Sequence, residues 1–174
     1  MGHQLEPVDV DPAARLSECF GSVVAASIAA VPFKDSELID PIVRVFYEAG
    51  KKMSAPQYVS ALLEMHNTSR AIVQSLMPYD ALLTPTLARP AMLIGELPSR
   101  RDSYVEKALA WLPFTFPFNA TGQPAISIPN GLSRAGLPIG LQIVGRPYDE
   151  AGVIALAAAF EEAQPWRDRH PPFD

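Results

Sequence analysis

The first part of the chain repeats its apolar positions with a helical period. Three segments, 12–30, 36–50 and 54–77, carry apolar residues three or four positions apart. Asp11 and Ser54 stand where N-caps are expected, and each is followed within two positions by a proline, which fits the first turn of a helix. The pattern therefore predicts three helices, and the small residues in the first of them allow close packing in an antiparallel layer.

Shorter runs with a different period flank these segments. Leu5 to Val10 alternates apolar and polar residues, which predicts a short strand, and Pro7 favours a sheet edge. Thirteen of the 18 prolines lie from Pro78 onward, so the second part should consist of short strands joined by rigid loops. We predict a buried strand at 81–84, a helix at 104–111, strands at 125–128 and 139–144, and a last helix from Asp149 to Glu162.

The two later strands are separated by Asn130-Gly131 and Ala135-Gly136, which favours a hairpin-like return. The fold class is therefore α/β, a mixed sheet with flanking helices. Residues 1–174 form a single partial domain, in which 1–78 supply a strand and a helical layer, and 79–174 a Pro-rich strand and loop region with a C-terminal helix. Three or four short strands can hardly cover the apolar faces of five helices, so we expect only part of a larger sheet.

Composition narrows the possible functions. The net charge is −5 with both signs interspersed, which argues against nucleic-acid binding. The one cysteine, Cys19, excludes an intrachain disulfide and lies in an apolar helical run, as a buried, inert thiol would. No signal peptide is recognisable, and the longest apolar run, 23–33, is too short to cross a bilayer, so we expect a cytoplasmic protein without membrane contact. No metal-ligand spacing or phosphate loop is present, and we expect no metal or other cofactor.

The segment 118–147, FNATGQPAISIPNGLSRAGLPIGLQIVGRP, carries the most specific pattern. It resembles the closing segment of the amidase-signature family, as does 79–86, YDALLTPT. The matching positions are Asn119, Gly122, Pro124, Pro129, Gly131, Gly136, Leu137, Pro138, Gly140, Gln142, Gly145 and Arg146. The resemblance implies the C-terminal portion of that family's fold, a mixed sheet flanked by helices, and a whole protein that hydrolyses amide C–N bonds.

The catalytic residues of the family have no counterpart in these 174 residues. Amidase-signature enzymes use a serine nucleophile, a second serine in a cis peptide and a lysine base, and the serines lie in a Gly- and Ser-rich run. No such run occurs here, and none of the lysines has a serine-rich partner loop. We therefore assign no catalytic residue, and we expect the chain to be a C-terminal segment that is inactive alone.

The resemblance also implies candidate substrate-binding residues. Phe114, Thr115, Phe118 and Asn119 would line or support the substrate cleft, although Asn119 could equally satisfy the backbone of a turn in which Gly122 adopts an unusual φ. Leu112 occupies a position that tends to be acidic in the family branch that serves the glutamine-dependent tRNA amidotransferase, where it holds an ammonium group. An apolar residue cannot replace that interaction, which favours an apolar or aryl amide over glutamine.

Other functions remain open at this point. A Ser-His-Asp set could be drawn from Ser127, His66 and Asp80, but no nucleophile-elbow motif supports it, and chance explains it better. The chain could be a non-catalytic binding or scaffold protein from a truncated gene, or one half of a split amidase. Its expected partners are a small-molecule amide in the full-length family and either the missing N-terminal portion or a second copy, bound through the uncovered surface.

Overall fold

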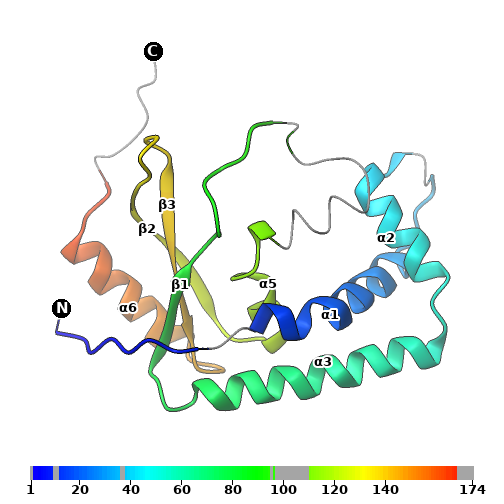
Figure 1. The fold of residues 1–174 in the computed structure, drawn as a ribbon, viewed down its shortest axis with the longest axis horizontal. Coiled ribbons are helices and arrows are strands. Elements are labelled where there is room, and N and C mark those ends of the chain that lie inside the picture. The colour runs from blue at the N-terminus through cyan, green and yellow to red at the C-terminus, as the bar shows by residue number, and fades with distance from the viewer. Residues whose placement is uncertain (1, 10–11, 36–37, 95, 97–109, 168–174) are drawn as a thin grey trace.

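The computed structural model describes residues 2–9, 12–35, 38–94, 96 and 110–167. Its helices and strands, in chain order, are α1 (Pro12–Ala29), α2 (Pro41–Lys51), α3 (Ala55–Leu76), β1 (Ala81–Pro85), α5 (Phe116–Thr121), β2 (Ala125–Leu132), β3 (Pro138–Gly145) and α6 (Glu150–Ala163). Figure 1 shows a helical layer made by α1, α2 and α3 on one side, the sheet beside it, and α6 on the far side of the sheet. This arrangement confirms the predicted α/β class.

The three predicted helices of the first part all form, with one corrected boundary. The Ser54 hydroxyl accepts from the backbone N–H of Gln57, whose side chain accepts from the Ser54 N–H, so a complete capping box starts α3. The predicted start of the second helix at Ser36 lies outside the described residues. Leu38 precedes α2 and is 85% exposed, because Asp40 caps the Ile42 N–H and the helix begins only at Pro41.

The three described strands form one antiparallel sheet in the order β1-β3-β2. The predicted hairpin joins β2 to β3, but its turn lies near Gly136, which has a φ of 78°. Asn130 and Gly131, expected to take part in the return, instead lie within β2, where the register shifts between Pro129 and Gly131. The parallel pairing that a mixed sheet requires is not found among the described strands.

Two strand predictions were wrong in part. Residues 5–9 are extended but belong to no strand, because no described strand lies beside them to share its hydrogen bonds. Strand β1 forms as predicted but is not buried: it lies at the sheet edge, and Leu83 is 39% exposed. Of the helix expected at 104–111, only Ala110 and Trp111 are described, and both are helical.

Apolar side chains pack on both faces of the sheet. On one face, Ile128 and Ile143 contact Ala157 of α6. On the other face, Val144 joins a cluster that links the sheet to α1, α3 and α5, formed by Leu16, Cys19, Ile72, Leu76, Phe116, Phe118 and Val144. The sheet is therefore the middle layer, and α5 is held between it and the helical layer. No described helix is long and apolar enough to cross a membrane.

Candidate functional site

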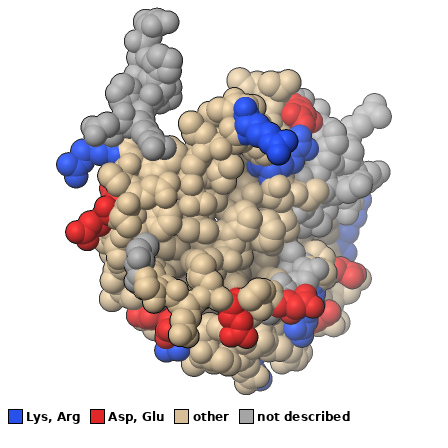
Figure 2. Space-filling model, turned by 60° about the vertical axis from the view of Figure 1, so that its left-hand side comes forward, with Lys and Arg blue, Asp and Glu red and all other residues tan. Residues whose placement is uncertain are grey.

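A wide groove runs along the edge of β1 that has no described strand beside it. Its walls come from the N-terminal segment 2–8, from β1, and from a group of mostly apolar side chains, namely Pro113, Phe114, Phe118, Leu141, Ile143, Leu156 and Phe160. Figure 2, which brings the side of the N-terminus and α6 forward, shows a surface whose centre is largely uncharged and whose charged side chains lie around it. The groove has a volume of about 1830 Å³, which exceeds the roughly 300–1,000 Å³ of a typical small-molecule pocket.

The two phenylalanines reach the groove through the short helix α5 and the turn before it. Phe118 is 3% exposed, so its ring both fills the core and closes the floor of the groove. The helix ends at Gly122, whose φ of 70° is left-handed, as the sequence predicted. Thr121 receives the Gln123 N–H on its hydroxyl, which satisfies the same turn. This helix was not predicted from the sequence, because it is only six residues long and contains Pro117.

The other predicted substrate-binding residues lie close by but do not line the groove. The Thr115 N–H and hydroxyl both donate to the Leu112 carbonyl, at 3.2 and 3.3 Å, and both side chains are half-buried. Asn119 is exposed on α5. The structure thus gathers Phe114 and Phe118 at one wall and places Leu112 and Thr115 in the turn that carries it.

A polar group on β3 links this wall to the sheet, and it was not predicted from the sequence. Gln142 is 5% exposed, and its Nε2 donates to the Thr84 Oγ1 at 2.9 Å and to the Phe114 carbonyl at 2.6 Å. Beyond it, the Thr86 and Ser127 hydroxyls share a 2.7 Å hydrogen bond across Gly140. The partners of Gln142 are 28 and 58 positions away in the chain, so no local pattern could have shown them.

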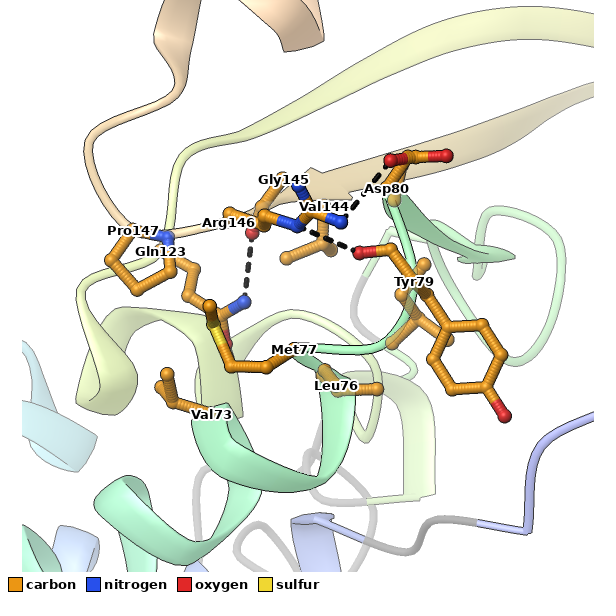
Figure 3. A pocket seen from close by; sticks show the side chains of 12 residues that line it. Val73, Leu76, Met77, Tyr79, Asp80, Gln123, Val144, Gly145, Arg146 and Pro147 are labelled. Carbon is orange, nitrogen blue, oxygen red and sulfur yellow. Dashed lines mark hydrogen bonds and ion pairs between the residues drawn. The ribbon is translucent and has the colours of Figure 1, made fainter.

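A much smaller cavity, shown in Figure 3, lies where α3 meets the end of β3. Arg146 donates through Nε to the Tyr79 carbonyl at 3.0 Å and forms an ion pair with Asp80 at 3.1 Å. Gln123 donates to the Gly145 carbonyl at 2.8 Å, which leaves its buried Oε1 without a partner among the described residues. The cavity has a volume of about 10 Å³, close to one water molecule, so these contacts fix the strand end and leave no room for a substrate.

The candidate nucleophiles do not form a catalytic set. Ser127 bonds to Thr86, Asp80 pairs with Arg146, and His66 is exposed on α3, so the set considered from the sequence is not assembled. Cys19 is 3% exposed, and burial raises the pKa of its thiol, with a further increase from the nearby Glu64 carboxylate. The described part of the chain also contains no cluster of three or more potential metal ligands.

Comparison with known proteins identifies the family. A sequence model of the amidase family matches residues 2–154, and the chain belongs to that family. The first component of the glutamyl-tRNA(Gln) amidotransferase of Thermodesulfovibrio yellowstonii is 46% identical over 92 residues, which cover 53% of this chain and 18% of that protein. The 6-aminohexanoate-cyclic-dimer hydrolase of Paenarthrobacter ureafaciens is 42% identical over 101 residues, which cover 53% of this chain and 20% of that protein.

Solved structures agree with this assignment. A 6-aminohexanoate cyclic dimer hydrolase superposes with a TM-score of 0.82 at 26% identity, over 98% of this chain and 39% of that one. A bacterial aryl acylamidase of the amidase signature family gives a TM-score of 0.65 at 26% identity, over 90% of this chain and 36% of that one. The chain therefore matches about a fifth of the length of the curated relatives and about two fifths of these structures.

Proposed function

We propose that this chain supplies part of the core and one wall of the substrate groove of an amide hydrolase. Family membership across residues 2–154 supports amide hydrolysis as the reaction class. The observation that carries the proposal is the position of Phe114 and Phe118, which the family resemblance assigns to the cleft and which line the groove beside β1. The groove contributes apolar surface, while the reacting groups come from another part of the enzyme.

The chain alone is proposed to be inactive. Serine attack on an amide needs a base within hydrogen-bond reach and donors for the developing oxyanion. No Gly- and Ser-rich run occurs in the sequence. Among the described residues, the Ser69, Ser75 and Ser127 hydroxyls bond to the Ala120 carbonyl, the Ile72 carbonyl and Thr86, so no lysine or histidine activates them. The missing groups are therefore assigned to a partner portion of the enzyme.

The proposed substrate class is an apolar or aryl amide. The wall beside the groove is aromatic, and Leu112 lies in the turn that carries it. Transfer of an ammonium group from water to such a surface carries a desolvation cost that an apolar side chain cannot offset. A neutral aromatic amide loses little by the same transfer, and burial of its ring is favourable.

The proposal is tested by the hydrolysis of an aryl anilide. The chain is assayed alone and together with a separate chain that carries the family's lysine and serine-rich run. We expect no turnover by either chain alone and turnover of the anilide, but not of glutamine, by the mixture. Turnover by this chain alone would refute the division of labour, and equal turnover of glutamine would refute the substrate class. Assembly of the two chains is followed separately by light scattering.

A second candidate is a binding or scaffold role without catalysis, or its variant, half of a split amidase. The size of the groove favours a chain segment as its occupant, because a small amide would fill only part of about 1830 Å³. The free edge of β1 would pair with a strand from the missing N-terminal portion or from a second copy. A mixture that assembles but does not turn over the anilide would favour this role over the first.

A further inference from the structure

Thr84 presents a hydroxyl to the groove from the middle of β1. It is directly opposite Gln142 in the β1–β3 register, so both side chains lie on the same face of the sheet. Gln142 in turn occupies the central strand and is almost fully buried. The polarity of the Thr84 hydroxyl therefore depends on how the Gln142 amide is oriented.

The Phe114 carbonyl fixes that orientation. A backbone carbonyl can only accept a hydrogen bond, so the Gln142 atom that lies 2.6 Å from it must be the amide nitrogen. The reversed amide would place two acceptor oxygens against each other. The same nitrogen lies 2.9 Å from the Thr84 Oγ1, and its second hydrogen is donated there. Gln142 is thus a donor to both neighbours.

The consequence falls on the Thr84 hydroxyl. A hydroxyl has one hydrogen to donate, and Thr84 uses its oxygen to accept from Gln142, so that hydrogen remains available. Among the described residues, Gln142 is the only hydrogen-bond partner of the Thr84 side chain. We propose that the Thr84 hydroxyl, held as a donor by Gln142, binds the carbonyl oxygen of an amide ligand in the groove.

The surroundings suit such a contact. Thr84 shares the groove lining with Phe114, whose backbone orients Gln142 and whose ring belongs to the apolar wall. A hydrogen bond made beside apolar side chains is stronger than one made in water, because water competes less for both groups. An aryl amide would place its ring against the wall and its carbonyl toward Thr84. The inference rests on the proposed function in assigning an amide as the ligand.

Two matched ligands test the contact. Acetanilide carries the amide carbonyl, and N-ethylaniline has a methylene group in its place, while both are uncharged at neutral pH. Their dissociation constants are measured by NMR titration of the complete chain, with the Thr84 and Phe114 backbone amides as reporters. One hydrogen bond predicts that the chain binds acetanilide roughly threefold to tenfold more tightly than N-ethylaniline.

The variants separate the hydroxyl from the fold. Thr84→Val keeps the shape and should abolish the preference, whereas Thr84→Ser should retain it. Gln142→Met, which cannot donate, should weaken the preference as well. Thr86→Val is the control: the Thr86 hydroxyl bonds to Ser127 and does not line the groove, so the preference should be unchanged. Melting temperatures of all four variants verify that they are folded.

The outcomes are distinct from those of the hydrolysis assay. Equal dissociation constants for the two ligands, no binding of either, or a preference that survives Thr84→Val would overturn the Thr84 contact. None of these results depends on a nucleophile, so the contact is judged on binding alone. Conversely, a carbonyl preference in a chain that never supports hydrolysis would leave the contact standing and refute the proposed function.

Discussion

Cys19 shows how strongly one residue's environment sets its chemistry. Its thiol donates to the Leu16 carbonyl at 3.3 Å, and burial followed by the Glu64 charge raises the pKa of the thiol. The thiolate is the reactive form, so the native thiol should react slowly with thiol reagents. The sequence predicted this inert thiol, because small apolar neighbours at helical spacing are typical of a core position.

The same shift predicts a pH dependence of stability. The unfolded chain releases the Cys19 proton near the ordinary thiol pKa of 9.0, whereas the native chain retains it to higher pH. The native state is therefore destabilised as pH rises above that value, and the effect is absent below it. Urea unfolding at about pH 7 and about pH 10 should show a larger loss of stability in the natural chain than in Cys19→Ala. Parallel losses in the two proteins would contradict this.

Residue-level prediction was accurate for local chemistry and incomplete for the site. Gly122 was expected to have an unusual φ, and it does, because a turn leaves its signature in adjacent residues. Phe114 and Phe118 were expected at the cleft, and they line the groove. Thr84 and Gln142 were not singled out as candidates. Their pairing depends on strand register, which no short segment of sequence determines.

At the scale of elements, the closest helix contact is that between α1 and α2. A side chain on Gly50 of α2 would overlap the Ala25 carbonyl of α1 and lie 2.7 Å from the Ala29 Cβ. Gly50→Ala should therefore destabilise the chain by about 1–3 kcal/mol, measured as the free energy of unfolding in urea.

The matched control is on the opposing helix. Gly21 in α1 has open space where a Cβ would lie, so Gly21→Ala should be neutral or stabilise the chain by up to about 1 kcal/mol through helix propensity. If both substitutions changed stability by the same amount, the close approach of the two helices would be wrong.

Elements with their own start signals were predicted well, and elements that need a partner were not. Asp149 and Ser54 cap α6 and α3 as expected, because a cap acts within its own helix. The segment 5–9 has the period of a strand, yet it forms none, since a strand exists only when its backbone groups are paired. Strand β1 forms but lies at the edge for a similar reason: one side of it has no described neighbour.

At the scale of the whole molecule, the free edge of β1 and the groove beside it dominate the surface. Exposed edges and apolar grooves promote association between chains. We expect concentration-dependent self-association in sedimentation velocity, which Leu83→Lys on the edge should reduce. Leu38→Lys is the control, because Leu38 is exposed before α2 and away from the edge. Equal effects of the two substitutions, or a natural chain that stays monomeric, would contradict the expectation.

The central claim is that this chain contributes the wall of a substrate groove and no nucleophile. Intact-mass spectrometry after treatment with a serine-directed fluorophosphonate tests this most directly, with an active serine hydrolase in the same reaction as a positive control. We predict that the hydrolase is modified while the chain remains at 18.9 kDa without an adduct. Stoichiometric adduct formation on the folded chain, lost on unfolding, would reveal an activated serine within these 174 residues and contradict the claim.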